Sequence, residues 1–318
     1  RDGSTKFDML PNTAAAVMEI CKAAKRRFGL TATPIPNRTR DLWAQLDLVE
    51  PWAWGKFHDF GVRYCGGFQD TYGWKYTDLS NEDELLERLN WSRYKTDQKA
   101  VTKNLPAKRR QIVYLDHDEQ NRPASIKRDL KRTKGDRESI FEVMLYEAAS
   151  RKRKYIIERV LEAVEGGQKV VIFTGRRTDC DRLGNDLSKK IKDAPVFCAH
   201  GGTSADKRDQ IRHEYMKAKV AVLVGTGDAW GESVNLQDTD LALFVMIPWT
   251  PRAIRQWEGR FSRLGQKRPV LISYVIARGT VDEHVADILL NKLPPVSAIV
   301  KDETLEDLEA AFSSNRED

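Results

Sequence analysis

The stretch Lys169–Arg176, which reads Lys-Val-Val-Ile-Phe-Thr-Gly-Arg, decides the fold. Four consecutive apolar residues, three of them β-branched, come before a Thr-Gly turn. A short apolar run that ends in such a turn is typical of a strand buried on both faces, as in a parallel sheet. The spacing of apolar residues then predicts a helix over 178–190, so the segment predicts a strand, loop and helix unit.

The same alternation continues towards the C-terminus and also begins upstream. Apolar runs predict strands over 111–115, 195–199, 220–224, 241–247 and 270–276. The stretches between and after them predict helices over 204–217, 251–262 and 281–291. Strands that alternate with helices predict an α/β fold, with a mainly parallel sheet covered by helices on both faces.

The N-terminal third has a different pattern. Apolar spacing predicts a helix over 13–27, and Phe28–Leu30 reads as a short buried strand that ends before a turn with Thr31 and Thr33. Residues 50–76 are rich in aromatic residues and glycine, which predicts an insertion with a small core of its own.

Composition limits the class of protein. The chain has 318 residues, of which 41% are hydrophobic, which is enough for two globular domains. No apolar run is long enough to span a membrane, and the first residues lack the apolar core of a signal peptide. We therefore expect a cytoplasmic or nucleoid-associated protein, or a nuclear one, that is not secreted and has no membrane partner.

The cysteines and histidines do not predict a metal site. The four cysteines form no Cys-x-x-Cys pair, and the five histidines are scattered. Structural zinc sites usually need such spacings. We expect reduced thiols and no metal bound by this chain alone.

The net charge of +6 is unevenly distributed. Residues 93–154 contain 18 Lys and Arg against 9 Asp and Glu, so this segment has an excess of nine positive charges and the remainder is net acidic. A basic zone of this kind favours a polyanion such as nucleic acid. A solvated hinge between domains explains it equally well. Arg109, within a Lys-Arg-Arg triplet, is our candidate for DNA contact.

Polar or glycine-rich loops follow three of the predicted strands: Thr174–Arg176, His200–Ser204 and Gly225–Gly227. The carboxyl ends of parallel strands meet at one edge of a sheet, where open α/β sheets bind ligands. Glycine lets a backbone approach a phosphate, and hydroxyl groups donate to it. One such loop is weak evidence because strand-to-helix turns need glycine in any case, but three on one edge favour a phosphate site.

The segment Gln256–Gln266 reads Gln-Trp-Glu-Gly-Arg-Phe-Ser-Arg-Leu-Gly-Gln. Arg260 and Arg263 are three residues apart, so on a helix both would project from one face. Arginine binds phosphate oxygens well and stabilises the charge that develops in phosphoryl transfer. Without its context, the pair would be a solvated basic face.

Several segments together resemble a known family. Leu30–Arg38 looks like motif III of superfamily 2 translocases, and Gly231–Leu236 looks like motif V. Gln256–Gln266 resembles motif VI of the Swi/Snf family. Three further stretches are similar to the annealing-helicase (HARP-like) branch: Phe60–Cys65, Tyr72–Tyr76 and Leu105–Arg109.

This resemblance implies a domain organisation. Residues 1–50 would be the C-terminal end of a first RecA-like lobe, and 51–110 a helical and aromatic insertion with a basic linker. Residues 111–295 would form a second RecA-like lobe, followed by a C-terminal tail over 296–318. ATP and Mg²⁺ would be shared with the first lobe, which is therefore a partner of this chain.

The resemblance also implies roles for individual residues. Arg260 and Arg263 match the arginine fingers, which reach ATP phosphates across the cleft between lobes. The positions that match ATP-site or coupling residues are Gln256, Gly231, Thr31 and Thr33. The positions expected to touch DNA are Thr203, Ser204, Arg208, Thr226, Trp249 and Arg109. For Trp249, an apolar plug at the end of a strand is an equally good explanation.

Some elements of a complete ATPase are missing from the sequence. No Gly-x-x-x-x-Gly-Lys-Ser/Thr occurs, and the Asp-Glu pairs, such as Asp282-Glu283, lie at helix starts or before a loop rather than after strands. We therefore expect that this chain alone does not hydrolyse ATP. We also expect that the chain is a fragment of a larger protein, and that this fragment begins just past motif II.

Our hypothesis is a fragment of an ATP-dependent translocase on duplex or branched DNA, without sequence specificity. The alternative is a non-enzymatic DNA-binding adaptor that keeps the fold. An RNA helicase is disfavoured by the form of motif VI and by the aromatic insertion.

Overall fold

The computed structural model describes residues 12–21, 23–31, 34–94, 105–116, 124–230, 235–261 and 265–300, with residues 307, 308, 310 and 312. The chain forms two compact units. The N-terminal unit contains residues 1–96 and 292–303, and the C-terminal unit contains residues 97–291 and 304–318. Three candidate residues, Thr33, Gly231 and Arg263, lie outside the described ranges.

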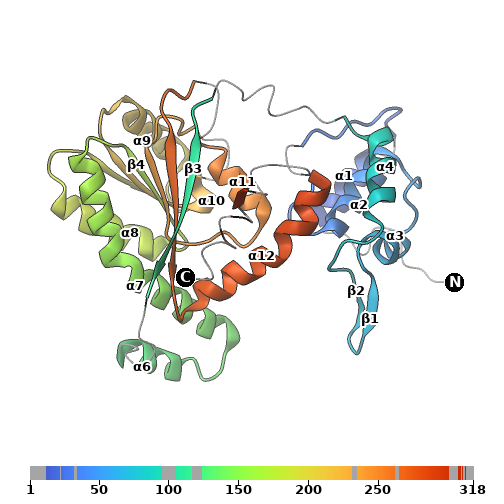
Figure 1. Cartoon of the computed structure of the whole chain (residues 1–318), viewed down its shortest axis with the longest axis horizontal. Coiled ribbons are helices and arrows are strands. Elements are labelled where there is room, and N and C mark those ends of the chain that lie inside the picture. The colour runs from blue at the N-terminus through green and yellow to red at the C-terminus, as the bar shows by residue number, and fades with distance from the viewer. Residues whose placement is uncertain are drawn as a thin grey trace. The chain divides into compact units, whose positions relative to one another are not determined.

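The C-terminal unit contains a six-stranded sheet in which every pair of neighbouring strands is parallel (Figure 1). The strand order is β3-β8-β7-β4-β6-β5. The strands are β3 (Lys108–Leu115), β4 (Val170–Thr174), β5 (Val196–Ala199), β6 (Val222–Thr226), β7 (Leu241–Phe244) and β8 (Val270–Ala277). The predicted α/β fold, a mainly parallel sheet with helices on both faces, is confirmed.

Helices connect these strands, and one more helix follows the last strand. They are α6 (Ala124–Arg132), α7 (Arg137–Glu165), α8 (Arg177–Lys190), α9 (Ala205–Lys217), α10 (Gly227–Trp230), α11 (Pro251–Glu258) and α12 (Val281–Val300). The prediction for α12 was nine residues too short, because the helix continues through Pro294 and Pro295. Each proline removes a helical hydrogen bond. The flanking residues Leu293, Val296 and Ile299 are buried, so packing outweighs that loss.

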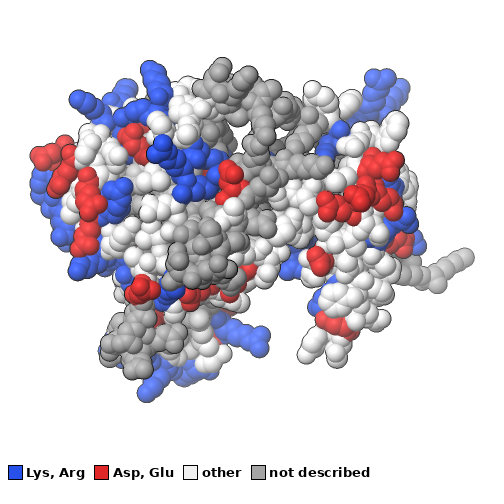
Figure 2. Space-filling model, in the orientation of Figure 1, with Lys and Arg blue, Asp and Glu red and all other residues white. Residues whose placement is uncertain are grey.

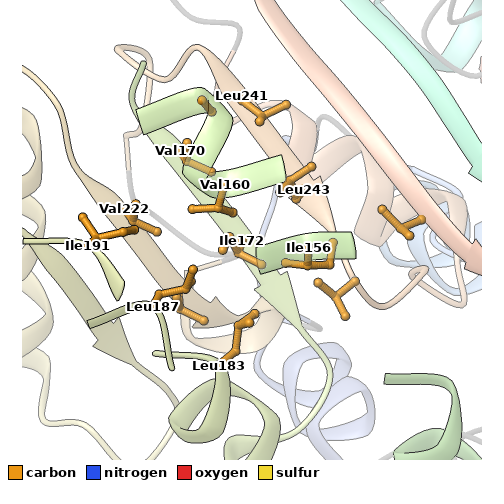
Figure 3. Packing of buried hydrophobic residues seen from close by; sticks show 14 of the residues in the cluster. Ile156, Val160, Val170, Ile172, Leu183, Leu187, Ile191, Val222, Leu241 and Leu243 are labelled. Carbon is orange, nitrogen blue, oxygen red and sulfur yellow. The ribbon is translucent and has the colours of Figure 1, made fainter. Parts of the chain in front are cut away.

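One face of the sheet packs an aliphatic core against α7 and α8. Ile156 of α7 and Leu183 and Leu187 of α8 contact strand residues such as Ile172 and Leu243 (Figure 3). All five are buried, and each apolar side chain of this size contributes about 1.5–3 kcal/mol when it is fully removed from water. Burial of this face therefore contributes to the stability of the unit.

The opposite face is aromatic. Trp257 of α11 stacks on Phe173 of β4 at 5.3 Å and on Phe244 of β7 at 5.9 Å between ring centroids. Phe244 in turn stacks on Tyr274 of β8 at 4.7 Å, and Phe261 lies 5.9 Å from Phe173. Because strand side chains alternate between faces, Phe173 points to this side while Ile172 points to the aliphatic core. The aromatic face thus fixes α11 on the sheet.

The N-terminal unit is mainly helical. Its elements are α1 (Asn12–Cys21), a 3₁₀ turn η1 (Thr39–Asp41), α2 (Leu42–Val49), α3 (Phe57–Tyr64), the hairpin β1 (Phe68–Asp70) and β2 (Gly73–Lys75), and α4 (Glu82–Ser92). Trp54 contacts Phe60 at 6.1 Å and Tyr64 at 6.4 Å, and all three are buried. The aromatic-rich stretch has a small core, as its composition predicts.

The predicted strand Phe28–Leu30 is wrong. These residues form no strand, and Phe28 and Leu30 are 84% and 98% exposed. The only sheet in the described part of this unit is the hairpin β1–β2, which does not include this stretch. A short apolar run becomes a strand only when a neighbouring strand satisfies its backbone groups. No described strand does so here, and Thr31 at its end is exposed as well.

Candidate nucleotide and nucleic-acid interface

Three of the predicted loops lie side by side at the carboxyl edge of the sheet. Thr174 is the register partner of Thr226, and Ala199 is the partner of Gly225. The loops that follow β4, β5 and β6 therefore begin at the same level of the sheet. The sequence predicted this arrangement from the parallel order alone.

Two glycines of this edge make room for protein side chains. A Cβ on Gly227 would overlap the ring of Trp257, and one on Gly225 would overlap the ring of Trp230. The sequence had suggested a different role, in which these glycines let the backbone approach a phosphate. The missing side chain of Gly227 lets α11 lie against the end of β6, and the phosphate role stays a prediction.

Helix α11 contains the first three residues of the segment that resembles motif VI, and its ends are well defined. The Thr250 hydroxyl accepts a hydrogen bond from the Ala253 amide at 3.2 Å, and Pro251 occupies the first turn. These are standard signals for a helix start. The helix ends at Glu258, and Gly259 caps it.

The predicted helix over 251–262 is therefore too long, and Arg260 does not lie on a helix face. It lies in the turn after α11, where its amide bonds to the Trp257 carbonyl at 3.1 Å. Glycine has a low helix propensity, which favours an end at this point. Arg260 is 7% exposed, and its carbonyl accepts a hydrogen bond from the Leu236 amide at 3.0 Å. Gln256, four residues earlier, is half-buried.

The residues predicted to touch DNA after β5 take part in local hydrogen bonds. The Thr203 hydroxyl accepts from the His200 amide at 3.1 Å, and the Ser204 hydroxyl caps α9 by accepting from the Lys207 amide. Arg208 donates to the Ala229 carbonyl of α10 at 3.3 Å. Ser204 is exposed, so of these three its hydroxyl is the best placed to meet a ligand.

The remaining candidates lie in different surroundings. Thr226 is buried at the end of β6, and Trp249 packs on Phe141 of α7 at 5.4 Å between ring centroids. That contact is the packing expected of an apolar plug. Arg109 is exposed on the edge strand β3, whereas Thr31 belongs to the N-terminal unit. On the face drawn in Figure 2, basic and acidic side chains are interspersed over the C-terminal unit.

Sequence reasoning missed Arg177, the first residue of α8. Its side chain is exposed, and its guanidinium lies beside Gly201 and Gly202 of the loop after β5. The neighbouring Arg176 is instead paired with Asp179 at 2.8 Å. The signal was the second arginine of Thr-Gly-Arg-Arg, directly at a helix start on the carboxyl edge. Arg177 is thus a further cation available to a phosphate.

Sequence reasoning also missed a buried charge cluster, which we call the Glu258 cluster: Glu258, Lys108, Arg110 and Tyr274. Arg110 binds both carboxylate oxygens of Glu258, at 2.8 and 2.7 Å. Lys108 lies 2.9 Å from one oxygen, and the Tyr274 hydroxyl donates to the other at 2.8 Å. Two members of the basic triplet therefore face the protein interior.

The cluster keeps Glu258 ionised. Burial by itself raises the pKa of the Glu258 carboxyl, but the charges of Lys108 and Arg110 and their hydrogen bonds outweigh burial, so the pKa lies below its ordinary value. Burial and the nearby carboxylate raise the pKa of Tyr274, so its hydroxyl stays protonated and donates. With its acceptor sites occupied, Glu258 is not available as a ligand for Mg²⁺.

The donors near the end of α11 fit phosphate rather than a metal. Arg260 offers a guanidinium and Gln256 an amide, and both groups donate hydrogen bonds to phosphate oxygens. Mg²⁺ prefers oxygen ligands, in particular carboxylates. Since the carboxylate of this segment is already paired with two cations, these residues suit phosphate oxygens, and Mg²⁺ would need ligands from elsewhere.

Within the described ranges, one group of side chains could hold a metal ion: Cys180, Asp181 and Cys198. All four cysteines of the chain are free thiols. The two sulfur atoms of Cys180 and Cys198 are 2.9 Å apart. Two thiolates on a tetrahedral zinc ion would be about 3.8 Å apart, given Zn–S bonds of about 2.3 Å. We therefore do not assign a metal site to this group.

No helix among the described residues combines the length and the apolar character needed to cross a bilayer.

Comparison with known proteins identifies the family. Residues 8–169 match the model of the SNF2-related domain, and residues 151–265 match the helicase conserved C-terminal domain.

Curated relatives agree with these matches. The chain is 31% identical over 294 residues to SWI/SNF-related matrix-associated actin-dependent regulator of chromatin subfamily A-like protein 1 of Xenopus laevis, covering 87% of this chain and 30% of that protein. It is 25% identical over 297 residues to the human DNA annealing helicase and endonuclease ZRANB3, covering 84% and 26%. The chain thus spans less than a third of the length of these relatives.

Among solved structures, the Sulfolobus solfataricus SWI2/SNF2 ATPase core in complex with dsDNA is 21% identical, with a TM-score of 0.46, over 86% of this chain and 63% of that one. The SNF2-related model alone covers half of the present chain, and the helicase C-terminal model continues from it. The chain therefore belongs to the family of SNF2-related, helicase-like ATPase domains.

Proposed function

We propose that this chain is the C-terminal half of an ATP-dependent translocase that moves on duplex or branched DNA. Arg260 and Arg263 would bind the ATP phosphates as arginine fingers, beside Gln256. The contact between Trp257 and Gly227 carries the proposal, because it holds α11 and the turn with Arg260 at the carboxyl end of β6. Open α/β sheets bind their ligands at that edge.

In the reaction, water would attack the γ-phosphorus of ATP while the bond from that phosphorus to the β,γ-bridging oxygen breaks, so that ADP leaves and inorganic phosphate forms. Arg260 and Arg263 would neutralise the charge that spreads over the phosphate oxygens. Mg²⁺, when bound, would supply further positive charge to stabilise the phosphates. Its ligands and the phosphate-binding lysine would come from the N-terminal RecA-like lobe, so this chain alone would be inactive. Thr31, Thr33 and Gly231 would couple nucleotide binding to DNA.

We propose the domain boundaries given by the family resemblance, with the second RecA-like lobe over 111–295. DNA would bind through its phosphates, without sequence specificity. Among the candidates, Ser204 and Arg109 are exposed, and Arg177 is exposed beside the same loop as Ser204. Hydroxyl and guanidinium groups of this kind position a protein on the DNA backbone but do not read bases.

The arginine fingers are tested in the full-length protein by its DNA-stimulated ATPase activity. Arg260→Ala and Arg263→Ala should each lower kcat by about 10³-fold or more, the usual range for an arginine finger. Arg252→Ala is the matched control, because Arg252 is an exposed arginine on α11, the helix that precedes the turn with Arg260. Wild-type kcat in both finger variants would show that the assignment is wrong.

DNA binding is tested by the salt dependence of affinity. The logarithm of the binding constant should fall steeply with the logarithm of salt concentration, and a slope near zero would exclude phosphate binding. Competition among duplex DNA, forked DNA and RNA identifies the substrate class. A full-length protein that binds DNA with this slope but hydrolyses no ATP would instead be the adaptor.

A further inference from the structure

Glu258 is the last residue of α11 and one of the few fully buried carboxylates in the described chain, with 0% of its side chain exposed. Its two oxygens receive four donor groups: two from Arg110, one from Lys108 and one from Tyr274. A bidentate pairing between arginine and carboxylate fixes orientation as well as distance. The end of α11 is therefore held in one direction relative to β3 and β8.

The chain continues from this fixed point directly to Arg260. Two residues span at most about 7 Å, so the Arg260 backbone cannot lie far from Glu258. On the other side, the Arg260 carbonyl is held by the Leu236 amide at 3.0 Å. The turn is thus attached at two points, one of them ionic.

Stability alone does not require this arrangement. Apolar side chains of similar volume often replace a buried ion pair without loss of stability. The aromatic stack of Trp257 on Phe173 and Phe244 already anchors the helix. The four directed hydrogen bonds also fix the position of the residues that follow Glu258. Precise position matters because a shift of about 1 Å at a catalytic group can lower a rate about 100-fold.

We infer that Glu258 is a positioning residue: held by Arg110, Lys108 and Tyr274, it sets the place of the Arg260 guanidinium for phosphoryl transfer. This inference rests on the proposed function. It makes two residues of the basic linker, Lys108 and Arg110, part of the support of the ATP site rather than of the DNA surface.

The test uses Glu258→Gln in the full-length protein. The amide keeps the volume of the side chain but loses the charge that pairs with Arg110. We expect kcat of the DNA-stimulated ATPase to fall about 10- to 100-fold, with the KM for ATP changed less than about twofold, since the lost interaction belongs to the transition state. Hydrogen exchange should become faster at the amides of residues 253–261, and this can be measured without nucleotide.

A double variant separates positioning from general damage. If Glu258 acts through Arg260, then kcat of Glu258→Gln/Arg260→Ala equals that of Arg260→Ala within about twofold. If the losses in kcat of the two single variants multiply in the double variant, the inference is wrong. The control is Lys169→Met, which removes a buried cation elsewhere in the unit and should leave kcat of the folded protein unchanged.

The remaining outcomes distinguish the positioning role of Glu258 from the proposed function. If Arg260→Ala lowers kcat while Glu258→Gln changes neither kcat nor hydrogen exchange, the positioning role is wrong and the proposed function stands. If kcat is unchanged in both Arg260→Ala and Arg263→Ala, the proposed function fails, and the inference fails with it.

Discussion

Two of the clusters of buried charge in the described part of the C-terminal unit differ in position and in exposure. In the Glu258 cluster, Glu258 and Arg110 are 0% and 6% exposed. In the second, the Lys169 cluster, the Lys169 amine binds Asp238 at 2.6 Å and the Met216 carbonyl at 2.9 Å. Arg268 completes that cluster with Asp238 and Asp240, but Asp238 and Arg268 are 38% and 48% exposed.

The comparison shows which of the two clusters lies close enough to a proposed catalytic residue to affect more than stability. Lys169 and Asp240 precede strands β4 and β7, so the Lys169 cluster joins the amino ends of two strands. Glu258 ends the helix that leads to Arg260. Both clusters offset the loss of water around charged groups by pairing them. Only the Glu258 cluster places that pairing within two residues of a proposed catalytic group.

The largest expected effect comes from removing the centre of each cluster. Glu258→Leu leaves Arg110 buried with less negative charge around it, and breaking a buried pair in this way costs about 3–5 kcal/mol. Lys169→Met should cost less, about 1–3 kcal/mol, because Asp238 is partly hydrated and keeps Arg268. Exchange of the slowest amides of β4 measures both values, and equal losses would remove the distinction between the clusters.

An effect smaller than that of Glu258→Leu is expected from Gly227→Ala, which disturbs α11 without touching its charges. The new Cβ would overlap the Trp257 ring, and overpacking of this kind costs about 1–3 kcal/mol. Gly166→Ala is the control, because its nearest neighbour would be 3.4 Å away, and it should change stability by less than about 0.5 kcal/mol. Thermal unfolding compares the two. If Gly227→Ala is as mild as the control, Trp257 does not anchor α11 at this point.

The sheet could be predicted from sequence because each apolar run is bounded by turns and separated by a helix, as Val170–Phe173 illustrates. The Glu258 cluster could not be found in the same way, because Arg110 is 148 residues from Glu258 in sequence. A partial signal existed. The strand was predicted to begin at residue 111, but β3 begins at Lys108. With that start, alternation places Lys108 and Arg110 on one face and Arg109 on the other.

A further effect, smaller again, concerns acid. The pKa of Asp238 is also lowered, because hydrogen bonds and charges from Lys169 and Arg268 outweigh burial, which raises it. A carboxyl with a lowered pKa in the folded state contributes stability above its unfolded pKa, about 4 for these groups, and loses it as pH falls through the folded value. The melting temperature below about pH 4 should therefore fall less in Glu258→Gln than in the wild type.

Asp238→Asn gives the comparison for that measurement. Asp238 is partly exposed, whereas Glu258 is fully buried. Asp238→Asn should therefore reduce the fall in melting temperature at low pH by less than Glu258→Gln does. If Asp238→Asn reduces the fall in melting temperature at low pH more than Glu258→Gln does, the Lys169 cluster contributes more to acid sensitivity than the Glu258 cluster. The same outcome would show that solvent does not weaken the Lys169 cluster.

The smallest effect on stability is expected for Arg109→Ala. Arg109 is exposed and lies between two residues of the Glu258 cluster on β3, so its loss should change stability by less than about 0.5 kcal/mol. If Arg109 binds a DNA phosphate, the variant should weaken binding to all sequences alike and reduce the salt slope by about one. Arg110→Ala should do the reverse, lowering stability and kcat while leaving the salt slope unchanged. A salt slope that falls in Arg110→Ala but not in Arg109→Ala would contradict the alternation that separates the inward from the outward cations of this strand.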